Sequence, residues 1–151
     1  MNGAVWMPDI FFFILMLVAG VTVALQPLIN ANLATRIGVI QSSFISFLVG
    51  TLALAGVVFF RNDGDLKAIT GAPLWQLSGG LLGAFFVTVL IIAVPRIGTL
   101  AALSAAIATQ LAAGVVVDHF GLLGGRHIPM DVWRISGTVL LVIGAGLVLK
   151  G

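Results

Sequence analysis

The hydrophobic and polar positions of this chain form long apolar stretches, separated by short segments that hold nearly all of the charged residues. Charged residues are absent from residues 10–35, 37–60, 68–95 and 97–117, and a further apolar stretch covers residues 135–149. A helix needs about 20 apolar residues to cross a hydrocarbon core about 30 Å thick. The first four stretches meet this length, and the last one meets it when the long side chain of Arg134 extends to the membrane surface.

The pattern therefore predicts an all-α integral membrane protein, a bundle of five transmembrane helices in a single domain of residues 1–151. The expected helices are residues 9–33, 41–60, 74–94, 99–117 and 131–149. We name the membrane side that holds the N-terminus side A and the opposite side side B. The first, third and fifth helices then run from side A to side B, and the other two return.

The three helices that begin on side A start alike. Each has a proline just before it or in its first turn, where the missing N–H has no helical partner to lose, and a tryptophan at the same end. The prolines are Pro8, Pro73 and Pro129, and the tryptophans are Trp6, Trp75 and Trp133. Because tryptophan favours the headgroup layer, we expect an aromatic belt on side A.

Composition agrees with the lipid bilayer as the surroundings of this chain, since 60% of its residues are hydrophobic and 8% are charged. A soluble domain carries about 25% charged residues. The chain has no cysteine, which excludes disulfides and thiolate chemistry. Its seven Lys and Arg residues are scattered singly, so no clustered basic face exists and no nucleic-acid partner is expected.

Basic residues are almost evenly divided between the two membrane sides. Side A holds Arg61, Lys67, Arg126 and Arg134, and side B holds Arg36, Arg96 and Lys150. Orientation normally follows an excess of Lys and Arg on the cytoplasmic side. The balance favours the hypothesis that the chain inserts in both directions, which is a dual topology.

Small residues recur at spacings that place them on one face of a helix, where they allow two backbones to approach closely in lipid. They are Ser42, Ser46 and Gly50 in the second helix, Gly79 and Gly83 in the third, and Gly137 and Gly144 in the fifth. Two interpretations stay open. These residues pack helices within one chain, or they form a dimer seam or a sliding contact during transport.

The first helix carries the strongest polar signal. Gln26 and Asn30 lie four residues apart on one face, and Pro27 between them removes the hydrogen bond to Val23 and bends the helix. Bent helices with adjacent polar groups form substrate sites in transporters. These three residues are therefore candidates for substrate binding or gating. The alternative is that the amides only join helices by hydrogen bonds.

The fourth helix carries a polar stripe at four-residue steps, formed by Gln110, Gly114 and Asp118. Gln110 lies near mid-membrane by residue count and could line one polar cavity with Gln26 and Asn30. The alternative is again a hydrogen bond that joins two helices.

Asp118 and His119 are the one adjacent acid and imidazole of the sequence, at the end of the fourth helix. They are candidates for proton coupling or for holding a gate shut. The alternative is a structural pair of Asp118 with Arg126, Arg134 or His119, because buried charges are usually paired. Two histidines do not form a metal site without further ligands, so we expect no metal and no cofactor.

Catalytic motifs are absent from the sequence, which contains no nucleophile elbow, no P-loop and no His-Glu-x-x-His. The hydroxyl side chains lie within apolar helices without a nearby histidine. We therefore expect a protein that is not an enzyme.

Several segments together resemble the YdcZ-type family of bacterial inner-membrane proteins, which belongs to the drug/metabolite transporter superfamily. They are residues 25–31 (Leu-Gln-Pro-Leu-Ile-Asn-Ala), residues 94–98 (Val-Pro-Arg-Ile-Gly), and Gln110 followed by residues 118–121 (Asp-His-Phe-Gly). The resemblance covers essentially the whole chain. It implies a multi-pass protein of the bacterial inner membrane.

The resemblance also implies an architecture. Ten-helix members of the superfamily look like two five-helix halves in opposite orientations, so this chain would be one half and would pair with itself, in an antiparallel homodimer. The small multidrug members use a glutamate in their first helix to exchange protons for cations. This sequence has no glutamate and offers Gln26 there, so that mechanism is not expected, and Asp118 is the carboxylate left for proton coupling.

These observations lead to one principal hypothesis and two alternatives. The principal hypothesis is a secondary transporter that exports a small metabolite or drug-like solute by alternating access. An uncharged cavity at mid-membrane favours a neutral or weakly charged substrate. The alternatives are a small polytopic assembly or regulatory subunit, which needs no polar residue at mid-membrane, and a passive channel, which predicts flux without saturation.

Overall fold

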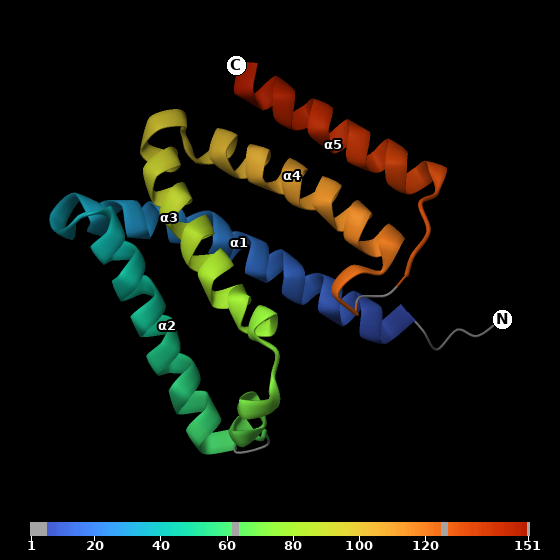
Figure 1. The fold of residues 1–151 in the computed structure, drawn as a ribbon. Helices are drawn as coiled ribbons and strands as arrows, with labels where there is room; N and C mark the ends of the chain where they lie inside the picture. The colour runs from blue at the N-terminus through green and yellow to red at the C-terminus, as the bar shows by residue number, and fades with distance from the viewer. Residues whose placement is uncertain (1–5, 62–63, 125–126, 151) are drawn as a thin grey trace. The chain divides into compact units, whose positions relative to one another are not determined.

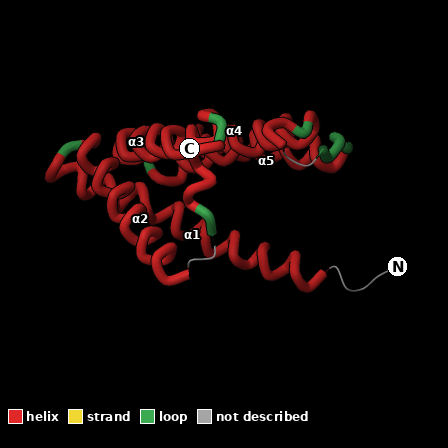
Figure 2. Tube along the Cα trace, turned by 60° about the horizontal axis from the view of Figure 1, so that its bottom comes forward, coloured by secondary structure: helices red, strands yellow, loops and turns green. Residues whose placement is uncertain are grey.

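The computed structural model describes residues 6–61, 64–124 and 127–150. Five long helices dominate these residues, and short loops join them (Figures 1 and 2). The helices are α1 (Trp6–Ile37), α2 (Val39–Arg61), α3 (Gly79–Ile97), α4 (Thr99–Phe120) and α5 (Val132–Lys150). Three short 3-10 helices accompany them, namely η1 (Leu66–Gly71), η2 (Leu74–Ser78) and η3 (Leu122–Gly124).

The predicted all-α fold with five membrane spans is confirmed, since five helices among the described residues are long and apolar enough to cross a bilayer. Their boundaries differ in detail from the prediction. α1 continues past Leu33 to Ile37, and α4 continues past Val117 to Phe120. Polar residues do not end a helix by themselves, and both helices instead stop directly before a glycine with positive φ, Gly38 or Gly121.

The chain divides into two compact units, residues 1–96 and residues 97–151, and each is described by itself. Unit 1 contains α1, α2, η1, η2 and α3, and unit 2 contains α4, η3 and α5. The assignment of residues 1–151 to one domain stays a prediction.

In unit 1, a single residue, Gly38, separates α1 from α2. Its φ of +94° is a conformation that side chains with a Cβ rarely adopt. The N–H of Gly38 donates to the carbonyl of Ala34 (2.9 Å), and its carbonyl accepts from the N–H of Ser42 (3.0 Å), so one helix ends and the next begins at the same residue. Gly98, between α3 and α4, has a similar φ of +84°. Each glycine follows Arg-Ile, so the sequence repeats the corner Arg-Ile-Gly.

α3 carries the most buried apolar face of unit 1. Its buried side chains are Val87, Leu90, Ile91 and Val94, spaced as one face of a helix requires. Near the start of α3, the ring of Phe47 from α2 approaches Gly83, where an added Cβ would lie 3.4 Å from the Phe47 Cζ atom. The missing side chain at Gly83 therefore makes room for an aromatic ring.

In unit 2, α4 and α5 lie side by side (Figure 1). α4 ends at Gly121, which has φ +59° and donates its N–H to the carbonyl of Asp118 (3.3 Å). That carbonyl also accepts from the N–H of Ile128 (2.8 Å), which ties the connecting loop back to the helix end. α5 begins after Asp131, whose side chain accepts from the N–H of Arg134 (2.7 Å) as an N-cap.

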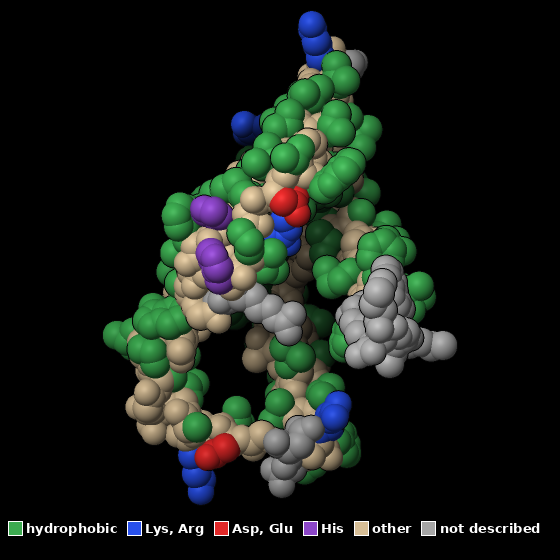
Figure 3. Space-filling view, turned by 90° about the vertical axis from the view of Figure 1, so that its right-hand side faces the viewer, with side chains coloured by type: hydrophobic (Ala, Val, Ile, Leu, Met, Phe, Trp, Pro, Cys, Tyr) green, Lys and Arg blue, Asp and Glu red, His purple; other side chains and the backbone are tan. Residues whose placement is uncertain are grey.

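Few residues of each span are buried within the chain. The buried share is 22% for the α3 span, 6% for the spans of α1, α2 and α4, and 0% for that of α5. Figure 3 shows hydrophobic side chains over much of the visible surface, with a few charged side chains between them. Such a surface fits lipid or another membrane protein, because apolar helices without lipid would expose these side chains to water.

Candidate functional site

A cluster of hydrogen bonds joins α1 to α2 in unit 1. The Asn30 side chain is 6% exposed, and its Nδ2 donates to Ser46 Oγ (3.2 Å). The hydroxyl of Ser42 is fully buried and donates to the main-chain carbonyl of Asn30 (2.7 Å). Asn30 therefore binds α2 through both its side chain and its backbone.

The cluster has a neighbour that joins α2 to α3. The hydroxyl of Ser43 donates to the Val39 carbonyl (3.1 Å) and lies 2.8 Å from the hydroxyl of Thr88 on α3, which can donate to it. Because Ser42 and Ser43 are adjacent, α2 uses one turn to bind α1 on one side and α3 on the other.

A cavity of about 240 Å³ lies directly beside the Asn30 cluster. Its walls come from α1 and α2, and they are Gln26, Ser46, Phe47, Gly50, Thr51 and Leu54. Gln26 lies one helical turn before Asn30, and the buried Pro27 follows it. The cavity thus places amide and hydroxyl groups against an aromatic and an aliphatic side chain.

A second cavity, of about 350 Å³, lies between α4 and α5 in unit 2. From α4 it is lined by Gln110, Leu111, Gly114, Val115 and Asp118, and from α5 by Trp133, Arg134, Gly137, Thr138 and Leu141. The stripe of Gln110, Gly114 and Asp118 therefore faces one cavity.

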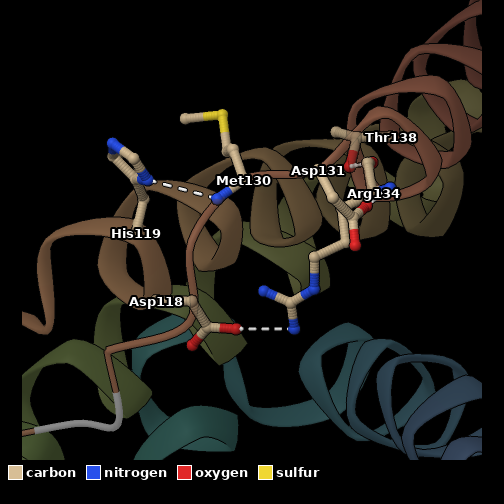
Figure 4. A network of polar contacts seen from close by, with 6 residues as sticks. All are labelled: Asp118, His119, Met130, Asp131, Arg134 and Thr138. Atoms are coloured by element: carbon tan, nitrogen blue, oxygen red, sulfur yellow. Dashed lines mark hydrogen bonds and ion pairs between the residues drawn. The ribbon is translucent and has the colours of Figure 1, made fainter.

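An ion pair forms part of the lining of this α4–α5 cavity. Asp118 Oδ2 lies 3.2 Å from Arg134 Nη2, and the side chains are 39% and 35% exposed, respectively (Figure 4). His119, the next residue of α4, points elsewhere and accepts a hydrogen bond at Nδ1 from the N–H of Met130 (3.3 Å). The carboxylate and the imidazole therefore have separate partners.

Comparison with known proteins identifies the family of this chain. The family profile described as "Putative inner membrane exporter, YdcZ" matches residues 11–147. The chain belongs to the YdcZ family. It is also 26% identical over 140 residues to the inner membrane protein YdcZ of Escherichia coli (strain K12), a match that covers 89% of this chain and 92% of that protein. No solved structure gives a significant match.

Membership of the YdcZ family confirms the resemblance seen in the sequence and places the chain, with its five spans, among multi-pass proteins of the bacterial inner membrane. The family is one of membrane exporters rather than enzymes. For this YdcZ-family chain, membrane export is therefore the general function, and the chemistry of its cavities must supply the details.

The structure distributes the predicted site residues of this YdcZ-family chain over two places. Gln26, Pro27 and Asn30 lie together in unit 1, and Gln110 lies with Asp118 in unit 2. A cavity shared by the amides of the two groups stays a prediction. Of the possible partners of Asp118, Arg134 forms an ion pair with it, His119 lies near His127 and Phe120, and Arg126 lies outside the described residues.

The small residues predicted to pack helices differ in their surroundings. Ser46 accepts the Asn30 hydrogen bond, and Gly83 contacts Phe47. A Cβ added at any of the other four glycines would meet nothing within 4 Å; these are Gly50, Gly79, Gly137 and Gly144. Packing of these four glycines against a second chain stays a prediction.

Sequence reasoning did not identify Ser43 and Thr88 as a pair, or Trp133 and Thr138 as cavity residues. Single hydroxyl groups in apolar helices are common, and nothing in the sequence shows which two of them meet. The sequence indicates only an aromatic-belt role for Trp133, although its four-residue spacing to Gly137 and Leu141 is a signal for the cavity side of α5.

Proposed function

We propose that this YdcZ-family chain is a secondary transporter that exports a small solute by alternating access. The observation that carries the proposal is that each unit of this largely apolar chain has a cavity with polar groups in its lining. Polar groups inside membrane helices are expensive, so those facing a cavity are natural contacts for a solute. In this mechanism Gln26 and Gln110 contact the solute along its path, and the buried Asn30 holds α1 against α2 beside it.

The Asp118–Arg134 pair serves as a gate in the proposed mechanism. Its contact of 3.2 Å holds α4 against α5 in the lining of the α4–α5 cavity. Since both side chains keep more than a third of their surface exposed, separating them leaves each within reach of water. A gate of this kind can open without stranding a fully buried charge.

The proposed working unit is an antiparallel homodimer of ten helices. Three observations support it: the low burial of the spans, the near balance of basic residues between the membrane sides, and the open glycines on α5. The alternating-access pathway then forms between two copies in opposite orientations, as inverted repeats do in transporters built from one chain.

Cysteine crosslinking tests the antiparallel pairing cleanly, because the chain has no cysteine of its own. Gly137 and Gly144 lie almost symmetrically about Leu141, the midpoint of α5. Two antiparallel α5 helices therefore place Gly137 of one copy opposite Gly144 of the other, whereas like positions are separated by seven residues, or about 10 Å, along the axis. A disulfide needs Cα atoms within about 7 Å.

We expect a mixture of Gly137→Cys and Gly144→Cys chains to form a mixed disulfide dimer, and either variant alone to form little. Crosslinking of each variant with itself would instead show a parallel pair and contradict the proposed arrangement. The amount of disulfide-linked dimer in each sample is read from a non-reducing gel of membranes, without purification.

Transport itself is tested in cells by comparing the small molecules exported by the wild type and by variants. Gln26→Leu and Gln110→Leu each remove an amide from one of the two cavities. We expect cells that produce either variant to release no more of the exported solute into the medium than cells that lack the protein. Thr109→Val is the matched control, because the Thr109 hydroxyl donates to Ala105 on its own helix and lies outside both cavities. Full export by both leucine variants would contradict the proposal, and export that never saturates would identify a channel.

A further inference from the structure

The charged groups of the α4–α5 cavity lie on its wall. Asp118 and Arg134 both belong to the lining, and their side chains are 39% and 35% exposed. The 3.2 Å contact joins one carboxylate oxygen to one guanidinium nitrogen (Figure 4). A carboxylate has a second acceptor oxygen and a guanidinium has five N–H donors, so each group can also bind a solute.

Charge balance restricts which solute can do so. A solute with only a positive group would bind Asp118 and compete with Arg134, leaving the guanidinium without its partner. A solute with only a negative group would bind Arg134 and leave the Asp118 carboxylate without its partner. A solute that carries both charges gives each side chain a partner, whereas a solute with one charge leaves the other side chain with water alone.

We propose that the α4–α5 cavity binds a small zwitterion, whose cationic group pairs with Asp118 and whose anionic group pairs with Arg134. This inference rests on the proposed transport function and names its class of substrate. A zwitterion has no net charge, which agrees with the weakly charged substrate expected from the uncharged middle of the membrane.

The remaining lining describes the body of the solute. Leu111, Val115 and Leu141 are aliphatic, and the largely exposed indole of Trp133 adds an aromatic surface to the lining. An aromatic face attracts a cationic group as well as an apolar one. The volume of about 350 Å³ suits a small molecule with an apolar side chain rather than a peptide or a lipid.

Binding is measured by tryptophan fluorescence of the purified full chain in lipid nanodiscs. Trp6→Phe and Trp75→Phe leave Trp133 as the sole reporter, in the cavity wall. The zwitterions are glycine, L-leucine and L-phenylalanine, and the matched solutes with one charge are L-leucinamide and 4-methylpentanoate. We expect at least one zwitterion to change the fluorescence saturably. We expect the solutes with one charge to bind with an affinity at least about tenfold lower, which corresponds to about 1.4 kcal/mol.

Variants test the assignment to the two charges. Asp118→Asn and Arg134→Gln should each weaken zwitterion binding about tenfold or more. The exchange variant Asp118→Arg with Arg134→Asp keeps both charges and should restore much of it, which separates recognition from a folding defect. Lys67→Gln, a change of an exposed cation in unit 1, is the control and should leave binding unchanged.

Two results would overturn the inference: no response to any zwitterion, or binding of L-leucinamide or 4-methylpentanoate as tight as that of L-leucine. Export that still depends on Gln26 and Gln110 would then leave the transport proposal in place, with a different substrate class. Loss of both the binding and the dependence on these amides would refute the two proposals together.

Discussion

The fully buried hydroxyl of Ser42 on α2 donates a 2.7 Å hydrogen bond to the backbone carbonyl of Asn30 on α1. Only eleven residues separate the two in the chain, and Gly38 reverses the chain between them. The bond therefore holds the α1–α2 corner closed, directly beside the cavity that contains Gln26.

Ser42→Ala removes that hydrogen bond without adding bulk. We expect a loss of stability near the average for such bonds in membranes, about 0.6 kcal/mol and at most about 1.7 kcal/mol. Reversible unfolding in mixed detergent micelles measures it. Thr22→Ala, whose hydroxyl donates to Ala19 on its own helix, is the control and should change stability less. An equal loss in the two variants would show that the contact between helices adds nothing.

Gly98→Ala tests the backbone conformation of a helix corner. Gly98 has φ +84° and ψ +156°, a region that is essentially limited to glycine, and an added Cβ would meet no atom within 4 Å. The substitution should therefore cost about 1–3 kcal/mol through backbone strain alone. Gly20→Ala within α1, where the space is equally open, should be neutral or stabilising by up to about 1 kcal/mol. Equal unfolding curves for the two variants would contradict this account.

Gly38→Ala adds a steric contact to the same kind of strain. Its Cβ would lie 2.5 Å from Gln41 Oε1, which is the end of a flexible side chain. Because that side chain can move away at small cost, we expect Gly38→Ala to be only slightly more destabilising than Gly98→Ala, and the further substitution Gln41→Ala to remove the difference. A double variant as unstable as Gly38→Ala would show that the side chain of Gln41 is not the cause.

The Asp118–Arg134 pair should contribute little to stability, whatever it contributes to binding. The two members of an exposed ion pair stabilise each other by about 0.2–1 kcal/mol, and both side chains of this pair are more than a third exposed. A double-mutant cycle of Asp118→Asn and Arg134→Gln measures the coupling. Asp131→Ala removes the N-cap of α5 and should cost more, about 0.5–2 kcal/mol. A coupling above that of the cap would argue for a structural lock instead of a gate.

Dual topology predicts that a cysteine in the loop between α2 and α3 is accessible from both faces of the inner membrane. Gly64→Cys is suitable, because Gly64 is exposed and an added side chain meets nothing within 4 Å. An impermeant thiol reagent should label about half of the chains in intact cells and the remainder after permeabilisation, if the two orientations are equally common. Labelling of all chains from one face would refute the hypothesis.

The sequence predicted the five spans well, because uninterrupted apolar stretches are sufficient to define them. It predicted the ends of α1 and α4 less well. A charged residue does not end a helix, so α1 continues through Arg36 and ends before Gly38, whose positive φ allows the chain to turn. The positive φ of Gly38 and Gly98 is a three-dimensional requirement that a sequence with 19 glycines does not single out.

The cavities show a similar limit. Four-residue spacing placed Gln110, Gly114 and Asp118 on one face of α4, and they do line one cavity. Spacing within one helix carries no information about the facing helix, so it left Arg134 as one candidate among three for Asp118 and gave no reason to pair Thr88 with Ser43.

The corners at Gly38 and Gly98 have a further consequence for how the protein meets the aqueous phase. With the alternating spans predicted from the sequence, both corners would lie on side B, where one residue replaces a loop, and the longer connections after α2 and α4 would lie on side A. Limited proteolysis, antibody recognition and epitope insertion between helices should therefore succeed only from side A. In an antiparallel pair, each face of the membrane then displays the loops of one copy beside the closed corners of the other, so either compartment could recognise the assembly by the same epitope.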